Sequence, residues 1–372
     1  MKKLLLASSA LVLTAGYAAA EVTVNGDGYF GVIYAEPDGV YTNGQDGDDT
    51  NWAFVYDLDF QFVGTGETDG GLIFGASVDA DDAAGAQGTQ GFEGEIFIQG
   101  DFGKLSMGDV DGGAEAIIGD LAGVGLTGLG DFNENIFLLS AGDPNECNEI
   151  EDTFESAFVE GVDENGDPVT VEIEDAIFVN AGSDNTGCGS GPLALYEYSN
   201  SGFTVALGLN DDEGYSAGLG YATDMWSLGI AYEYILEGGQ ITVFDTDFPQ
   251  GDLIATPDDD THHVIGAASV TAFDTTFKAT YGYLDAGSTE VDQWGLSATT
   301  SFDLWTFSAY YRQIDPDADG VDSSQFYGIG GEYDLGGGAA IVAGIIYADV
   351  DVGNDDFDDE GVFADFGLSF SF

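Results

Sequence analysis

Carboxylates are the most abundant reactive side chains of this chain. The sequence has 372 residues, with 69 Asp and Glu against 5 Lys and Arg, and a formal net charge of −64 at pH 7. Such a charge repels phosphates and excludes nucleic acid as a partner. No G-x-S-x-G elbow, Walker loop or histidine cluster is present, so we do not expect an enzyme. The chemistry left to these residues is the attraction of cations.

The two histidines, His262 and His263, are adjacent in sequence. Neighbouring residues of a strand point to opposite faces, so the pair makes poor joint ligands for a metal ion. We interpret them as the start of an ordinary strand.

The two cysteines, Cys147 and Cys188, are far apart in sequence. In an exported protein such a pair predicts a disulfide rather than a metal or redox site. Between them, residues 158–173 have two alternating arms about Asn165-Gly166, which is a strong hairpin signal. We therefore predict a hairpin inserted at residues 144–190 and pinned at its base.

The elements that position the charged groups are strands. From Trp52 to Phe62 every even position is apolar, and Asp57 and Asp59 alternate with them. This period of two marks a strand with one apolar face. It recurs in about sixteen segments, each near the roughly 10 residues that a tilted membrane strand needs. The predicted fold class is all-β, a transmembrane antiparallel β-barrel.

Both ends of the chain agree with export to an outer membrane. Residues 1–20 have the charged, apolar and small-residue order of a secretory signal and are too short for a membrane helix. At the other end, the even positions from Phe366 to Phe372 are apolar, whereas Asp365 and the serines alternate with them. We expect the apolar set to face lipid and Asp365 to face water, and Phe363 on the inner side has no explanation.

Short and long connections alternate between the predicted strands. Tight turns such as Thr223-Asp224 and Phe302-Asp303 are followed by long acidic segments such as 237–261. In outer-membrane barrels the short turns are periplasmic and the long loops face outward. We therefore expect both termini in the periplasm and residues 21–372 to form one barrel.

One connection, residues 110–191, is too long for an ordinary loop. Loops of such length are uncommon unless they are functional. Glu115 to Leu121 could form a short helix whose Ile117, Ile118 and Leu121 dock against a wall. We predict that this third loop folds into the lumen and converts a wide tube into a sieve.

Removal of residues 1–20 leaves three basic residues, Lys104, Lys278 and Arg312. Each alternates with apolar neighbours, so parity places all three on the lumen face. A Lys or Arg facing lipid at mid-membrane would cost roughly 2–4 kcal/mol. Lys104 lies near a turn and needs no special role, whereas Lys278 and Arg312 are candidates for a positive wall of the channel.

Several segments resemble Rhodobacter-type general diffusion porins. Phe102 to Leu121 resembles the start of the constriction loop of that family, Phe326 to Ile345 and the closing LSFSF resemble its last strands, and Asp69 to Val78 resembles an early one. Their order is preserved, so the resemblance covers most of the mature chain, with the loops diverging.

The resemblance implies a homotrimer of sixteen-stranded, water-filled barrels in the outer membrane, in contact with lipid and lipopolysaccharide. Each barrel would have a constriction of loop acids facing basic residues on the wall. The matching loop acids are Asp109, Asp111, Glu115, Asp120 and Asp131. Asp57 and Asp59 occupy wall positions where the family is expected to carry arginines. Because of this departure, most of the basic residues that would face the loop acids across the constriction are missing.

These features predict passive diffusion of ions and small hydrophilic solutes with a preference for cations. No cofactor is required. Ca²⁺, which takes oxygen ligands, is a candidate ligand of Asp109, Asp111, Glu115 and Asp120. Two alternatives stay open. A secreted acidic Ca²⁺-binding surface protein or adhesin would explain the charge, and a ligand-specific barrel receptor would explain the strands.

Overall fold

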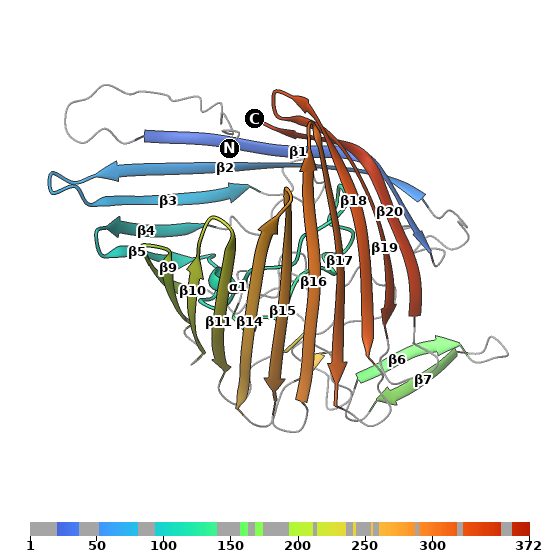
Figure 1. The fold of residues 1–372 in the computed structure, drawn as a ribbon. Coiled ribbons are helices and arrows are strands. Elements are labelled where there is room, and N and C mark those ends of the chain that lie inside the picture. Colours follow the sequence, from blue (N-terminus) through green and yellow to red (C-terminus); the bar gives the residue numbers. More distant parts are fainter. Residues whose placement is uncertain are drawn as a thin grey trace.

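The structure is a computed structural model that describes residues 21–36, 52–80, 94–139, 157–162, 168–173, 193–210, 214–235, 241–242, 254–255, 260–286, 290–317, 323–350 and 359–372. Within these ranges the chain forms a closed barrel of sixteen antiparallel strands and one short helix, α1 (Glu115–Ile118). Figure 1 shows the strands side by side as the wall of one tube. The predicted fold class and strand number are confirmed.

Around the barrel the strands follow chain order. They are β1 (Glu21–Glu36), β2 (Trp52–Glu67), β3 (Ile73–Ala80), β4 (Glu95–Gly100), β5 (Gly103–Gly108), β8 (Leu193–Asn200), β9 (Phe203–Leu209), β10 (Tyr215–Ala222), β11 (Trp226–Ile235), β14 (Thr261–Ala272), β15 (Thr275–Asp285), β16 (Glu290–Phe302), β17 (Trp305–Pro316), β18 (Ser324–Gly336), β19 (Ala339–Val350) and β20 (Asp359–Ser371). β20 pairs with β1 and closes the barrel.

Two small sheets lie outside the barrel order. β6 (Ala157–Val162) pairs antiparallel with β7 (Pro168–Ile173), within the segment predicted as an inserted hairpin. β12 (Ile241–Thr242) pairs with β13 (Ile254–Ala255). The leader at residues 1–20 and the cysteines Cys147 and Cys188 lie outside the described residues.

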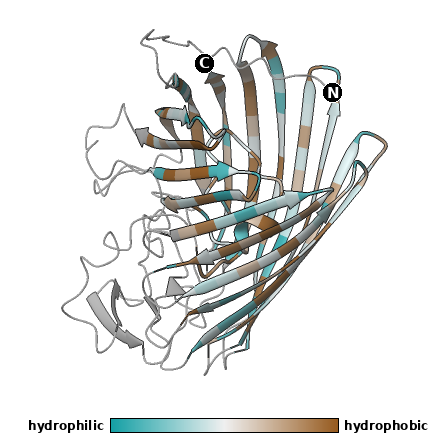
Figure 2. Cartoon of the chain, turned by 90° about the vertical axis from the view of Figure 1, so that its left-hand side faces the viewer, coloured by the Kyte–Doolittle hydropathy of each residue, from teal (hydrophilic) through white to brown (hydrophobic). Residues whose placement is uncertain are grey.

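Each strand has an inner and an outer face, as its alternation predicts. On β16 the outward Leu296 is 51% exposed, whereas Gln293, an odd residue of the same strand, is 2% exposed. Across the barrel the exposed set consists of large apolar side chains such as Phe54, Ile230 and Ile329. Figure 2 shows hydrophobic and hydrophilic residues alternating along the strands. The alternating exposure of the strand residues therefore gives the barrel an apolar outer face and an inner face of polar or small residues.

Tight turns and the chain ends lie at the same end of the barrel. The turn at Gly336 to Gly338 is bonded to the last strand, because Ser371 N donates to Gly338 O at 2.8 Å. Gly26 and Phe372 exchange two backbone hydrogen bonds of 2.8 Å across the seam between β1 and β20. Phe372 is thus part of the wall, and its ring packs edge-on against Phe60.

No helix within the described ranges has the length and hydropathy of a membrane-spanning helix.

We expect the outer apolar band to contact lipid hydrocarbon, which a substitution can test. Replacing Leu296 by Lys should lower the free energy of unfolding in lipid by about 2–4 kcal/mol, because an outward charge meets hydrocarbon. The matched control is Thr299→Lys, on the inner face of the same strand, which should cost far less. Urea unfolding in bilayers measures both, and equal losses would contradict the assignment of the faces.

Candidate functional site

Residues 111–139, which we call the inner belt, pack on the inner face of the barrel. The belt leaves β5, and helix α1 lies against β9, β10, β11 and β14. Its outgoing limb, residues 111–126, then runs along the wall to the seam between β1 and β20. Its return limb, residues 132–139, comes back over the same strands. In Figure 1 the helix lies behind the strands at the front of the tube.

Inward glycines mark the path of the outgoing limb. A Cβ placed on Gly330 would lie 2.9 Å from Val124 Cβ, and one on Gly31 would lie 2.6 Å from Leu126 Cδ2. Similar close approaches involve Gly208, Gly218, Gly229, Gly295, Gly344 and Gly367. These positions cannot carry a side chain while the belt lies against them. The wall therefore contains a shallow track that fits the belt backbone.

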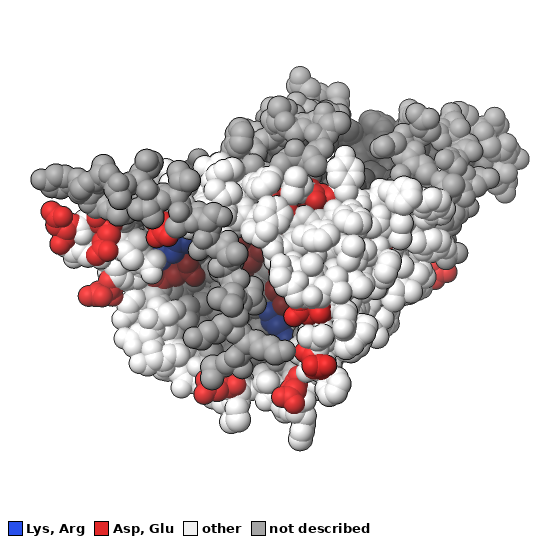
Figure 3. Space-filling model, turned by 90° about the horizontal axis from the view of Figure 1, so that it is seen from above, with Lys and Arg blue, Asp and Glu red and all other residues white. Residues whose placement is uncertain are grey.

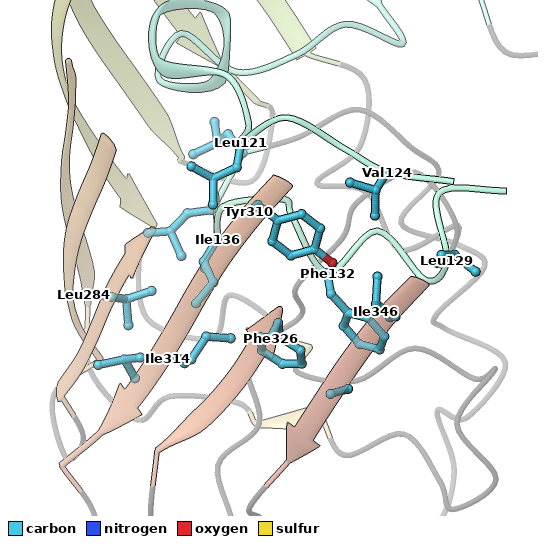
Figure 4. Close-up of a cluster of buried hydrophobic side chains, with 14 of the residues drawn as sticks. Leu121, Val124, Leu129, Phe132, Ile136, Leu284, Tyr310, Ile314, Phe326 and Ile346 are labelled. Carbon is cyan, nitrogen blue, oxygen red and sulfur yellow. The ribbon is translucent and has the colours of Figure 1, made fainter. Parts of the chain in front are cut away.

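Apolar side chains fill the space between the belt and the wall. Phe132 of the return limb stacks on Phe326 of β18, with ring centroids 4.8 Å apart, and Phe363 of β20 lies next to it at 6.2 Å. Phe363, unexplained by the sequence, is 3% exposed because the belt covers it. Figure 4 shows this cluster, with Ile136 and Leu121 pointing toward β17 and its neighbours. Each fully buried side chain of this kind contributes roughly 1.5–3 kcal/mol.

The two limbs of the belt are bonded to each other. Leu121 and Asn133 share two hydrogen bonds, from Leu121 N to Asn133 O at 3.2 Å and from Asn133 Nδ2 to Leu121 O at 3.1 Å. Asn135 N donates to Asp120 Oδ1 at 2.7 Å. Asp120, a predicted constriction acid, thus also joins the limbs.

Wall side chains satisfy the backbone of the belt. Asp365 Oδ2 accepts hydrogen bonds from Leu126 N at 2.6 Å and Thr127 N at 2.8 Å. Ser216 Oγ accepts one from Gly113 N at 2.7 Å. Asp365 was expected to face water, and this expectation is wrong. The belt covers Asp365 and leaves it 5% exposed.

The three basic residues lie on the inner face, as parity predicts, and the two lysines make polar contacts there. Lys104 pairs with Glu95 at 3.0 Å. Lys278 Nζ donates to Ile118 O at 2.7 Å and Asp120 O at 2.6 Å, at the carboxyl end of α1.

Arg312 lies beneath the belt and has no exposed surface. Its guanidinium carbon is 5.7 Å from the Phe326 ring centroid, and Asp120 and Glu134 are its acidic neighbours. A buried guanidinium cannot touch a passing solute.

The predicted acids lie on two surfaces. Asp57 and Asp59 are partly exposed on the inner face of β2, and Asp111, Glu115, Asp120 and Asp131 are on the belt, with Asp109 just before it. Asp111 is exposed, and the other belt acids are partly buried. These side chains have interaction partners.

Asp27 is a further inner acid, which the sequence prediction leaves out. It is exposed and lies directly opposite Asp59 in the register of β1 and β2. Like charges that face each other across strands are destabilising, so this pair is a structural cost. The alternation of inward and outward residues along β1 was the sequence signal that could have placed Asp27 on the inner face.

Among the described residues, no three His, Cys, Asp or Glu side chains are grouped so that they could hold a metal ion. Asp109, Asp111, Glu115 and Asp120 are therefore not brought together as a Ca²⁺ site in this part of the chain.

Hydroxyl pairs line the inner wall between the belt and the tight turns. Ser227 and Ser269 are 2.6 Å apart, and Thr271 and Thr276, which flank a turn, are 2.9 Å apart. Further pairs are Thr299 with Ser308 and Ser301 with Thr306, each at 3.1 Å. This surface offers donors and acceptors to hydrophilic solutes without charge.

Acidic groups dominate the charged surface that is seen from above. In Figure 3 Asp and Glu side chains are spread over the visible surface, whereas Lys and Arg show only in small patches between other atoms. The charged side chains that this view shows are thus mostly acidic.

Comparisons with known proteins agree with this architecture. A family model described as Gram-negative porin matches residues 7–354. The chain is 31% identical to a porin of Rhodobacter capsulatus over 95% of this chain and 100% of that protein. A porin structure refined at 1.8 Å resolution has a TM-score of 0.62 at 27% identity, over 95% of this chain and 100% of that one. A triple mutant of Rhodopseudomonas blastica porin matches with a TM-score of 0.54 at 22% identity, over 94% and 100% of the two chains.

The role of Asp365 as an anchor of the belt can be tested by amide hydrogen exchange. Asp365→Ala leaves two belt N–H groups without their acceptor, and each unsatisfied buried group costs about 1–3 kcal/mol. We expect protection of Leu126 and Thr127 to fall while strand amides keep theirs. Ser369→Ala, on the same face of β20, is the control. Unchanged protection at Leu126 would contradict the anchoring role.

Proposed function

The chain belongs to the Gram-negative porin family, and on this premise we propose that its channel prefers cations to anions. As a porin it is a general channel for passive diffusion across the outer membrane, and it is not an enzyme. The proposed preference for cations goes beyond membership of the family, and the charged residues of the inner wall support it.

The positions and contacts of the three basic residues carry the proposal. Lys104 is paired with Glu95, Lys278 is bonded to belt carbonyls, and Arg312 is fully buried. No other Lys or Arg exists in residues 21–372. Arg312 is thus covered by the belt, and the two lysines, which are partly exposed, hold their ammonium groups on Glu95 or on belt carbonyl groups.

Negative charge, in contrast, remains partly exposed on the inner surface. Asp27, Asp57 and Asp59 lie on adjacent strands β1 and β2, and Asp111 is exposed on the belt. Acidic side chains lining a pore favour cations. Screening over about 8 Å at physiological salt weakens this field but leaves it effective in a narrow passage.

The location within the membrane follows from the same premise. We propose that the tight turns and both termini lie in the periplasm, since short turns face that side in outer-membrane barrels. A homotrimer in contact with lipid and lipopolysaccharide is the assembly implied by the resemblance to Rhodobacter-type porins. Cross-linking of the protein in its native membrane would test it, and a monomer alone would contradict it.

The ion preference is tested by reversal potentials of reconstituted channels in a KCl gradient. We expect cation selectivity that declines as salt rises. Asp57→Asn and Asp59→Asn should each lower the cation-to-anion permeability ratio, by up to roughly sixfold at low salt, since a charge about 8 Å away in water contributes about 0.5 kcal/mol to the cation and the opposite amount to the anion.

Asp292→Asn is the matched control, because it removes the same charge from the outer face, where Asp292 accepts a hydrogen bond from Tyr281. The cation-to-anion permeability ratio of Asp292→Asn should stay near that of the wild type. Anion preference of the wild type would refute the proposal.

A further inference from the structure

The two adjacent histidines on β14 have different surroundings. His262 is exposed on the outer face, where its Nδ1 lies 2.7 Å from the Tyr232 hydroxyl. His263 points inward and has no exposed surface. Only His263 therefore lies where it can affect the passage.

His263 is the centre of a buried polar row on the inner wall. Its Nδ1 is 2.8 Å from Glu233 Oε2 on β11, and its Nε2 is 3.1 Å from Gln293 Nε2 on β16. Glu233 is 0% and Gln293 2% exposed. The row crosses β15 at Gly282, where a Cβ would lie 2.8 Å from both the ring and the amide. A glycine there lets the two side chains meet.

The row holds the return limb of the belt. Gln293 Oε1 accepts from Ile136 N at 2.8 Å, and Gln293 Nε2 donates to Ile136 O at 2.9 Å. Glu233 accepts from Leu138 N at 2.9 Å and from Leu139 N at 3.3 Å. Four of the hydrogen bonds that the return limb makes to the wall thus come from two side chains, and His263 connects them.

The hydrogen bonds fix the protonation of His263. Ile136 N must meet an acceptor and Ile136 O a donor, so the Gln293 amide can face the belt in one orientation only. In that orientation Gln293 Nε2 presents a donor to the imidazole, and His263 Nε2 must accept. The ring is therefore neutral, with its proton on Nδ1 donated to Glu233.

We propose that His263 is a positioning residue for the passage. In its neutral form it keeps Gln293 and Glu233 bound to the return limb, and its protonation releases that limb into the lumen. A protonated Nε2 sets a donor against the Gln293 amide. The amide must then turn, which costs both bonds to Ile136. The wall is occupied on the other side, so the released limb can move only toward the lumen.

Few other charges face this row. Glu233 is the carboxylate in contact with His263, and β14 and β16 carry no other charged residue at an inner position. On the remaining elements packed there, the charged side chains are Lys278 of β15, Arg312 of β17, and Glu115, Asp120 and Glu134 of the belt.

The experiment compares His263→Gln with His262→Gln in the full-length protein. Single-channel conductance in planar bilayers with symmetric KCl is followed from about pH 8 to about pH 5, the range in which histidine gains its charge. We expect the wild type and His262→Gln to lose most of their open-channel conductance reversibly. His263→Gln cannot gain the charge and should keep its conductance throughout.

Two results would overturn the proposal: no loss of conductance in the wild type, or the same loss in His263→Gln. Should that variant fail to fold, amide exchange of the wild type decides. Protection of Ile136, relative to β17 amides and corrected for intrinsic rates, should fall on acidification, and constant protection would refute the release. Symmetric salt makes the outcome independent of ion preference, so this proposal and the proposed cation selectivity fail separately.

Discussion

Backbone N–H groups of the inner belt have no neighbouring strand to pair with, and the barrel wall must supply acceptors in its place. Asp365, Glu233, Gln293 and Ser216 do so at the tip, the return limb and the start of the belt. Each lies at an inner position of its strand, and each is buried by the segment that it holds. An unsatisfied buried amide would cost about 1–3 kcal/mol. This requirement explains why polar residues interrupt an otherwise small-residue inner face, and it makes the position of the belt depend on a few wall side chains.

The local pattern of the sequence was sufficient for the barrel but insufficient for the belt. A period of two defines a strand and its faces, so the sixteen strands, the inner location of Lys278 and Arg312 and the outward Phe366 all follow from it. The docking of residues 111–139 depends on contacts between residues far apart in sequence, which no local period encodes. For this reason we expected Asp365 to face water and could assign no packing partner to Phe363 from the sequence. Inner glycines in strands that are otherwise regular, such as Gly295 and Gly330, were the one available signal of a close neighbour.

The same wall side chains limit what the basic residues can do. Lys278 and Arg312 are at inner positions, where a channel of opposed charges would need them. The belt instead uses the ammonium of Lys278 for its carbonyl groups and covers Arg312 altogether. A buried charge needs compensation nearby, and Asp120 and Glu134 supply opposite charge to Arg312, whose guanidinium nitrogens make no hydrogen bond within the described residues. Structural use of the few cations therefore ties them to Glu95, to belt carbonyl groups or beneath the belt, while Asp27, Asp57 and Asp59 lie on the inner face of β1 and β2.

The tip of the belt rests on the seam of the barrel. Leu126 lies over Gly31 of β1 and Gly367 of β20, and Asp365 of β20 holds the backbone of the same residue. This resting place is built from both the first and the last strand, so it is complete only in the closed cylinder. The docked belt thereby bridges β1 and β20 at the joint that closes the barrel.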